Sequence, residues 1–356
     1  MKIQKVDLLK ALNTIKPGLA TKTVIQQMEN VLFTGQDMIT YNDQICVLYP
    51  FETDFTVSIN YDDLYKIANK TTADDLEITL VDNELRIKSI EEIRTAERVI
   101  IKSTKAGLLI VEGDEINDSI NELVNQLPND NNEFKWQELH KDFMEGALLC
   151  IPASSHDMSQ GTLACLYTNG SDLICTDNLR VSWFALKESM NAEFFIKAAT
   201  VRELAAFEFT QFCVSGSWVH FQTGNSVVFS TRLIRGKSLD YYKEVFDGFK
   251  GNPVELPDGI KSVIDSASVM AEDDTIRDMT MVFKDGELIC STKSARGWIE
   301  KTMPVSYKKK TPVEFMISAT FLQQILSLPL KMTVGENKSL FESGSFKHVL
   351  IHRVGQ

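Results

Sequence analysis

Alternating hydrophobic and polar positions along the chain predict short strands that are joined in pairs by glycine turns. Three such hairpins share one layout: VLFTGQDMITYND from Val31, CLYTNGSDLICTDN from Cys165 and MVFKDGELICSTKS from Met281. In each, an aromatic residue ends the first strand, a glycine supplies the turn and an apolar pair follows on the second strand. The recurrence of this layout indicates an internal repeat.

A short helix is expected after each hairpin, in NYDDLYKI from Asn60, TVRELAAF from Thr200 and SATFLQQI from Ser318. Each segment opens with a residue that is favoured at a helix N-cap, and Thr200 with Glu203 has the spacing of a capping box. A second hairpin follows each helix, in LEITLVDNELRIK, FCVSGSWVHF and KMTVGENKSLF.

A longer amphipathic segment precedes each first hairpin, in DLLKALNTIK, QELHKDFMEGALLCI and GIKSVIDSASVM. The predicted unit is therefore helix, strands, helix and strands, present three times in an α+β chain. Turn-rich loops at 128–133 and 250–253 mark the boundaries. We expect domains at 1–132, 133–252 and 253–356.

The composition adds a cellular setting. At 356 residues and 44% hydrophobic, the chain is long enough for two or three cores. Its apolar runs are shorter than a membrane span requires, and its N-terminus has no signal-peptide pattern. Six cysteines without a Cys-x-x-Cys pair predict reduced, buried thiols in a cytoplasmic protein.

Several fragments of enzyme motifs are present but incomplete. Gly236, Lys237 and Ser238 match the tail of a phosphate-binding loop, but Thr231 stands where that loop needs its first glycine. His348 and His352 have the spacing of a metal pair, yet they lie in a β-branched strand without a cysteine or acidic cluster nearby. We therefore expect no catalytic residue, no metal, no cofactor and a non-enzymatic role.

The formal net charge of −12 argues against a broadly basic surface, but a local basic patch is compatible with that total. Cations lie on or beside the predicted helices, at Lys10, Lys22, Lys66, Lys70, Lys141, Lys197, Arg202 and Lys261. Acidic residues share these segments, so an ordinary solvated helix face explains the same composition.

Three stretches resemble one known family. SVVFSTRLIRGKSLDYYKEVF is similar to a strand and loop that end in Pro-Asp-Tyr in that family. Asp240 and Tyr241 match this ending, and Leu239 stands in place of the proline. LICTDNLRVSWFAL is similar to an Ala-Thr-Asp-Gly-His-Arg-Leu-Ala run, with Asn178 and Leu179 in place of Gly-His, and HVLIHRVGQ keeps the terminal arginine at Arg353. With its three repeats the chain resembles the bacterial DNA polymerase III beta subunit, the sliding clamp. The sparse identity indicates a divergent member, for which a phage or mobile-element origin would fit.

The resemblance implies a fold of three tandem DNA-clamp repeats, each with two helices packed on antiparallel sheets, forming half of a closed ring. It implies a processivity factor that encircles double-stranded DNA without reading sequence, as a head-to-tail homodimer, and tethers the replicative DNA polymerase. An ATP-dependent clamp loader would open the ring. The alternative is a clamp-fold adaptor that binds replication proteins without encircling DNA.

The resemblance also assigns residues. The cations named above would face DNA, and Val269 with Met270 would pack on the partner subunit near Ile67, Lys70 and the strand RVIIKS. A partner peptide would bind in a groove lined by Thr176, Arg180, Val181, Phe246, Leu350 and Ile351. For any one of Val181, Leu350 and Ile351 taken alone, a core strand position is the better explanation.

Overall fold

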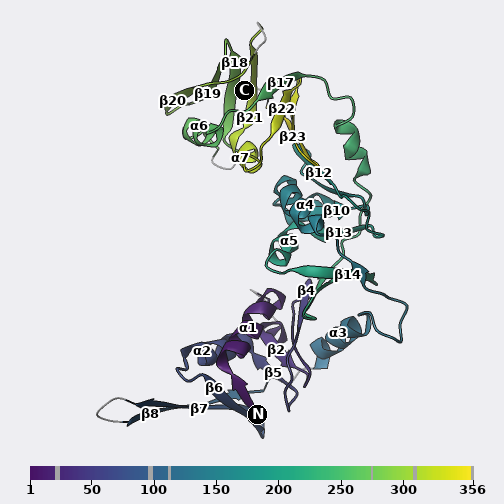
Figure 1. Cartoon of the computed structure of the whole chain (residues 1–356), viewed down its shortest axis with the longest axis vertical. Coiled ribbons are helices and arrows are strands. Elements are labelled where there is room, and N and C mark those ends of the chain that lie inside the picture. The colour runs from purple at the N-terminus through teal and green to yellow at the C-terminus, as the bar shows by residue number, and fades with distance from the viewer. Residues whose placement is uncertain (21–24, 95–98, 111–113, 274–275, 308–310, 354–356) are drawn as a thin grey trace. The chain divides into compact units, whose positions relative to one another are not determined.

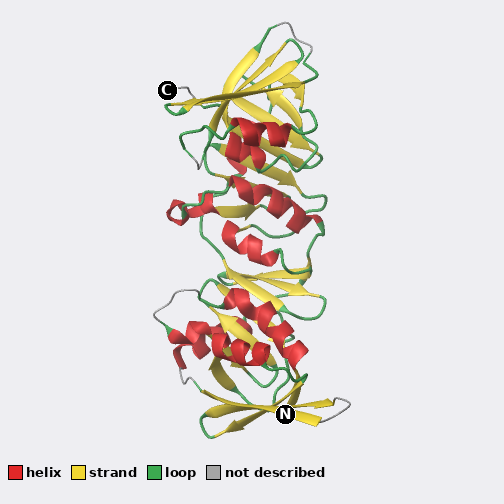
Figure 2. Ribbon diagram, turned by 90° about the vertical axis from the view of Figure 1, so that its left-hand side faces the viewer, coloured by secondary structure: helices red, strands yellow, loops and turns green. Residues whose placement is uncertain are grey.

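The computed structural model describes residues 1–20, 25–94, 99–110, 114–273, 276–307 and 311–353 (Figure 1). The chain forms two compact units: unit 1 is Met1–Leu139 with Ala206–Leu233, and unit 2 is His140–Ala205 with Ile234–Gln356. Segment 133–252 contributes to both units, and the division into three domains stays a prediction. Figure 2 shows helices lying against strands in each unit.

Unit 1 contains an eight-stranded and a four-stranded antiparallel sheet, with strand orders β5-β2-β3-β4-β16-β15-β14-β9 and β1-β6-β7-β8. Its strands are β1 (Lys2–Gln4), β2 (Asn30–Phe33), β3 (Asp37–Tyr41), β4 (Ile45–Pro50), β5 (Val57–Asn60), β6 (Asp75–Val81), β7 (Glu84–Arg94), β8 (Val99–Leu109), β9 (Gln137–Glu138), β14 (Phe209–Ser215), β15 (Trp218–Thr223) and β16 (Val228–Arg232). Its helices are α1 (Lys5–Ile15), α2 (Tyr61–Lys70) and α3 (Asp114–Asn125), with short 3-10 helices η1 (Lys16–Gly18) and η2 (Gln26–Glu29).

The helices of unit 1 cover both faces of the large sheet. α1 contacts α2 and packs on β3 and β4, where the Thr40 hydroxyl donates to the Ile15 carbonyl. α3 covers the opposite face, because its Ile120 and Leu123 cluster with Tyr41 and Trp218. Successive strand residues point to opposite faces, so β3 supplies both layers. We call the α1 side the helix-pair face and the α3 side the outer face.

Unit 2 repeats this plan, with strand orders β13-β10-β11-β12-β24-β23-β22-β17 and β20-β19-β18-β21. Its strands are β10 (Cys165–Thr168), β11 (Asp172–Thr176), β12 (Arg180–Ala185), β13 (Phe194–Lys197), β17 (Asn252–Glu255), β18 (Asp278–Lys284), β19 (Glu287–Ser294), β20 (Gly297–Pro304), β21 (Val313–Ser318), β22 (Lys331–Val334), β23 (Lys338–Ser343) and β24 (Phe346–Ile351). Its helices are α4 (Asp142–Cys150), α5 (Ala198–Leu204), α6 (Ile260–Ala267) and α7 (Ala319–Gln323), with 3-10 helices η3 (Ile151–Ala153), η4 (Met158–Ala164) and η5 (Asp240–Val245).

Each eight-stranded sheet joins strands of two successive repeats. In unit 1, β4 of the first repeat pairs antiparallel with β16 of the second. In unit 2, β12 of the second repeat pairs in the same way with β24 of the third. The pairing of main-chain groups across β4–β16 and β12–β24 therefore makes each sheet continuous from one repeat to the next.

The predicted elements are largely confirmed. All six hairpins form, and the side chains of Asn60 and Ser318 cap their helices by accepting from the backbone of Asp63 and Phe321. The N-cap at Thr200 and its capping box with Glu203 were wrong. β13 runs directly into α5, so extended Lys197 occupies the N-cap and Thr200 is buried within the helix.

Three further observations concern the cysteines, the apolar runs and helix α3. The six cysteines are unpaired and buried, and burial raises the pKa of Cys46 to about 12 and that of Cys165 to about 11. Across the described parts of the chain, none of the helices combines the length and apolar character that a membrane span requires. Helix α3 was not predicted, although the apolar residues of its sequence DEINDSINELVN recur at helical spacing, at Ile116, Ile120, Leu123 and Val124.

His220 predicts how the fold responds to acid. It is fully buried on β15, with its two ring nitrogens 2.8 Å from the Ser215 hydroxyl and 2.7 Å from the Ser230 hydroxyl. Burial lowers the pKa of His220 to about 4. The unfolded chain binds a proton near pH 6.5, whereas the folded chain does so only near pH 4. Stability is therefore lost as the pH falls through this window.

We predict that His220→Gln reduces the loss of unfolding free energy between pH 6.5 and pH 4.5 by roughly 2 kcal/mol. Urea titrations at both pH values measure it. His156→Gln, which changes an exposed histidine, is the control and should leave the loss unchanged. An equal loss in wild type and His220→Gln would show that His220 is not the titrating group.

Candidate functional site

The turn that follows β11 is built by a local hydrogen-bond pattern. The Asp177 carboxylate accepts from the backbone N–H groups of Leu179 and Arg180, at 3.0 and 3.1 Å. Asn178 lies between them with φ at 69°, in the left-handed region that asparagine tolerates better than most residues. This explains how asparagine stands where the resembled family has glycine.

Arg180 is almost completely buried, at 2% exposure. Its Nε lies 2.9 Å from the Asp177 carboxylate, its Nη1 donates to Gln324 at 2.5 Å, and its guanidinium carbon lies 3.6 Å from the centre of the Phe321 ring. Burial lowers the pKa of Arg180, and the Asp177 charge opposes this effect. Arg180 therefore fastens the α7 segment to β12 from the helix-pair face.

The strand register divides the six predicted peptide-binding residues between two faces. Val181 pairs with both Thr176 and Val349, whereas Arg180 pairs with Leu350. Because neighbouring strand residues point to opposite faces, Thr176 and Val181 lie on the outer face and Arg180 with Leu350 on the helix-pair face. Ile351 is half-buried and shares the face of Val349.

A loop segment, residues 234–249, covers the outer face of this sheet. Its Leu239 and Phe246 are buried in one cluster with Val181, and Tyr242 packs at the edge of the cluster. The Tyr242 hydroxyl donates to the Asn178 side chain at 2.5 Å. The outer face thus brings together Thr176, Val181, Phe246 and Ile351, with Tyr242 as a residue that the sequence reasoning missed.

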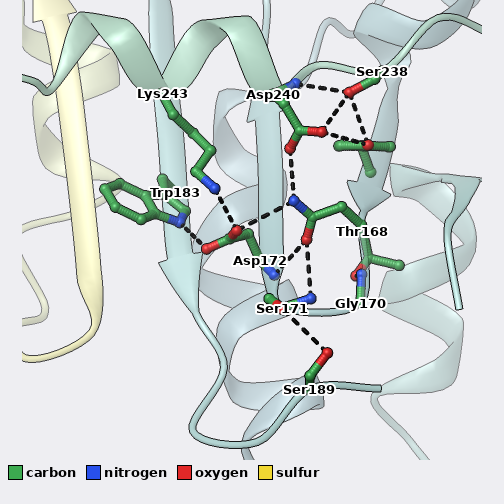
Figure 3. A network of polar contacts seen from close by, with 11 residues as sticks. Thr168, Gly170, Ser171, Asp172, Trp183, Ser189, Ser238, Asp240 and Lys243 are labelled. Carbon is green, nitrogen blue, oxygen red and sulfur yellow. Dashed lines mark hydrogen bonds and ion pairs between the residues drawn. The ribbon is translucent and has the colours of Figure 1, made fainter. Parts of the chain in front are cut away.

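Polar contacts fasten this loop to the sheet (Figure 3). On β11, Asp172 is bound at 2.6 Å by both the Lys243 ammonium and the Trp183 indole N–H. The Asn169 amide donates to Asp240 at 2.7 Å. Burial alone would raise the pKa of Asp240, but hydrogen bonds from Ser238, Asn169 and Tyr167 outweigh it and lower that pKa.

The Gly-Lys-Ser sequence belongs to the same loop. The Ser238 hydroxyl donates to the Asp240 carboxylate at 2.7 Å, and the Tyr167 hydroxyl lies 2.9 Å from both Ser238 and Glu193. A Cβ added to Gly236 would lie 2.1 Å from the Thr162 methyl. Two carboxylates beside Ser238 would repel a phosphate, so these residues anchor a loop.

His348 and His352 do not form a metal pair. His348 is fully buried against the Ser182 hydroxyl at 2.8 Å, and burial with the nearby Arg180 charge lowers its pKa to about 3. His352 stacks on Phe315 at 4.3 Å and binds the Ser339 hydroxyl. Within the described ranges, no group of three His, Cys, Asp or Glu side chains could hold a metal ion.

The predicted DNA-facing cations lie on or beside the helices. Those that are exposed are Lys10, Lys66, Lys70, Lys141, Arg202 and Lys261, and Lys197 is half-buried. Lys22 falls outside the described residues. Lys66 lies 3.9 Å from Asp62 and 4.0 Å from Asp63, so part of its charge is balanced locally.

The predicted interface residues lie beside two edge strands. In unit 1, Ile67 and Lys70 of α2 line a hollow of about 310 Å³ with Thr104 and Ala106 of β8. In unit 2, Val269 is 64% exposed just beyond α6, and the Met270 methyl lies near the start of β20, beside Gly297. Among the described residues, β8 and β20 each pair with a strand on one side only.

We predict that Asp240→Ala loosens the loop, because Ser238, Asn169 and Tyr167 lose a shared charged acceptor. Hydrogen exchange of amides 238–249 should become at least about tenfold faster, consistent with about 1–3 kcal/mol for lost charged hydrogen bonds. Asp247→Ala, which removes an exposed carboxylate from the same loop, is the matched control. Equal exchange in both variants would show that the network does not hold the loop.

The fold has close counterparts among solved structures, although no protein-family model and no curated protein sequence matches the chain. It is similar to the DNA polymerase III beta chain of Streptococcus pneumoniae, with a TM-score of 0.81 and 13% identity. It is also similar to the sliding clamps of Bartonella birtlesii, solved bound to griselimycin (0.80, 16%), and of Pseudomonas aeruginosa, solved with a ligand (0.78, 14%).

Each of these matches covers 99% of this chain and 99% of its counterpart. The match therefore extends over both units. With its low sequence identity, the chain has the fold of the bacterial DNA polymerase III beta sliding clamps, as the resemblance in its sequence implied.

Proposed function

We propose that this chain is a DNA sliding clamp, in which two copies joined head to tail enclose duplex DNA. One observation carries the proposal: the strand orders of the two four-stranded sheets correspond to the two halves of each eight-stranded sheet. If β20 of one copy pairs with β8 of another, the order becomes β21-β18-β19-β20-β8-β7-β6-β1. This order corresponds strand for strand to those of the two sheets within the chain.

Such pairing also removes a physical liability. An edge strand carries unpaired main-chain N–H and C=O groups and tends to pair with another chain. Joining β20 to β8 is a heterologous contact, so it gives a ring if the rotation closes after two copies. Each chain would then contribute three domains of a six-domain ring, with Val269 and Met270 entering the hollow beside Ile67 and Lys70.

The charges suit a ring that holds DNA loosely. Exposed Lys10, Arg202 and Lys261 project from helices, but acidic neighbours and the net charge of −12 keep attraction to phosphate weak. Weak attraction suits a clamp, because the closed ring retains the DNA by topology and must still slide along it. The role is non-enzymatic and cytoplasmic. The ring would be opened by an ATP-dependent loader.

A polymerase would be tethered through the outer face of unit 2. Tyr242 and Ile351 are half-buried there and would contact a short peptide with apolar side chains, whereas Thr176, Val181 and Phe246 are buried and would line the groove after a local adjustment of the 234–249 loop. Arg180 and Leu350 lie on the helix-pair face, so we propose that they stabilise β12 and β24 and do not contact the peptide.

We predict that Val269→Asp with Met270→Asp gives a folded monomer, because apolar contacts with Ile67 and Ala106 would be replaced by two desolvated carboxylates, a loss that an ion pair with Lys70 does not offset. Wild type, threaded onto a linear duplex that is then ligated into a circle, should stay on the circle in high salt and leave after the circle is cut. The charged variant should not be retained. Lys284→Asp, on an exposed β18 end, is the control. A dimeric charged variant, or wild type that binds linear and circular DNA equally, would contradict the proposal.

We predict that Tyr242→Ala with Ile351→Asp weakens binding of the C-terminal peptide of the cognate polymerase by at least about tenfold. The first change removes an aromatic contact from the outer face, and the second places a charge where an apolar side chain of the peptide would bind. Calorimetry measures the affinity, and near-ultraviolet circular dichroism confirms that the sheet is intact. Tyr241→Ala changes the exposed neighbour and is the control. Unchanged affinity in a folded double variant would place the peptide elsewhere.

A further inference from the structure

The two junctions within the chain follow one alignment rule. Its first half concerns the strand that comes from the earlier repeat. The last residues of β4 and β12, Pro50 and Ala185, pair with the first residues of the strands before them. Ile45 and Arg180 begin these two strands and form the first pair across each junction. In β20 the residue that pairs with the start of β19 is Pro304, so Ile299 is the corresponding position.

The second half of the rule concerns the strand from the later repeat. β15 and β23 begin at Trp218 and Lys338, which pair with Arg232 and Ile351. The residues just before these partners, Thr231 and Leu350, are the ones that meet Ile45 and Arg180. β7 begins at Glu84, which pairs with Leu109, so Leu108 is the corresponding position of β8.

We infer that β20 of one subunit pairs with β8 of the other in a single register, Ile299 opposite Leu108, and that Trp298 packs on Leu109 as the anchor of this contact. The inference rests on the proposed dimer and specifies its partner surface. It follows because both internal junctions obey the same rule, although their side chains differ completely: Ile45 with Thr231 in one, Arg180 with Leu350 in the other.

The main chain at the two junctions supports this register. The Arg232 N–H donates to the Gln44 carbonyl at 2.9 Å, and the Ile351 N–H donates to the Leu179 carbonyl at 3.1 Å. The corresponding groups at the subunit junction are the Leu109 N–H and the Trp298 carbonyl. Both lie on the unpaired edges of their strands, where the donor and the acceptor need partners.

Side-chain exposure supports it independently. Trp298 is 72% exposed and Leu109 is 74% exposed, and both are far more exposed than a large apolar side chain needs to be on a folded surface. Residues directly opposite in an antiparallel pair point to the same face, so the register brings these two side chains into contact. An aromatic ring against an aliphatic side chain is a favourable cross-strand pair.

The contact is continuous with the remainder of the proposed interface. Gly297 precedes Trp298, and its φ of 142° is a conformation that L side chains rarely adopt. The Met270 methyl lies beside this glycine, so the anchor and the Val269–Met270 pair flank the start of β20 together. On the other subunit, Ala106 of β8 lines the hollow that would receive Val269 and Met270, whereas Trp298 would lie on the opposite face of the sheet, against Leu109.

Disulfide trapping tests the register. The rule places Lys301 opposite Ala106, with Cα atoms about 4.5–5.5 Å apart, which suits a disulfide. Lys301→Cys with Ala106→Cys should give a covalent dimer under mild oxidation, and the native cysteines are buried and unpaired. In the variant with Lys301→Cys and Lys105→Cys, the second thiol is one position away and points to the other face of the sheet. This variant should give no covalent dimer.

Substitution tests the anchor. Trp298→Ala should raise the dissociation constant of the dimer at least about tenfold, as truncation of a central aromatic residue does at many interfaces. Exchanging the pair, Trp298→Leu with Leu109→Trp, should restore most of the affinity. Met158→Ala, an exposed apolar residue of unit 2, is the control and should leave the constant unchanged.

These experiments test the strand register and the existence of the dimer separately. Wild type that is monomeric at every concentration would overturn the proposed ring and this inference together. A dimeric wild type that cross-links through residue 105 and not through 106 would overturn the register alone. A dimer whose constant is unaffected by Trp298→Ala would remove Trp298 as the anchor.

Discussion

Antiparallel pairing between strands of successive repeats is the interaction on which this structure depends. Main-chain hydrogen bonds at β4–β16 and β12–β24 turn separate four-stranded pieces into continuous sheets. Because these bonds use groups that every residue possesses, the junctions tolerate side chains as different as Ile45 and Arg180. The same tolerance explains how a chain of 13–16% identity keeps the fold of its solved counterparts.

The outer faces show how each junction is protected from water. Cys46 of β4 and Val181 of β12 lie at corresponding positions and are buried, the first under α3 and the second under the 234–249 loop. At the corresponding position of β20 stands exposed Glu300. A junction formed between two subunits has no connecting segment to cover it, so a charged residue there is compatible with the proposed ring.

The covering loop of unit 2 is held by charge, whereas α3 of unit 1 is held mainly by apolar contacts. Asp172, Lys243 and Asp240 fix the loop through short hydrogen bonds, and Ile120 with Leu123 fix α3. A loop secured by a few polar contacts can adjust locally more easily than a packed helix. The outer face of unit 2 is therefore the better place for a site that accepts a peptide.

The sequence by itself determined the repeated order of helices and hairpins, because glycine turns, alternating strands and the caps at Asn60 and Ser318 act over a few residues. It also excluded a phosphate loop at Gly236. The tertiary structure decided which residues share a face: Thr176 and Arg180 are neighbours in one motif, but strand alternation and pairing with β24 place them on opposite sides of the sheet. It also decided that Lys197 occupies the N-cap position of α5 and that Tyr242 joins the outer face. These outcomes depend on partners distant in the sequence, which local patterns do not encode.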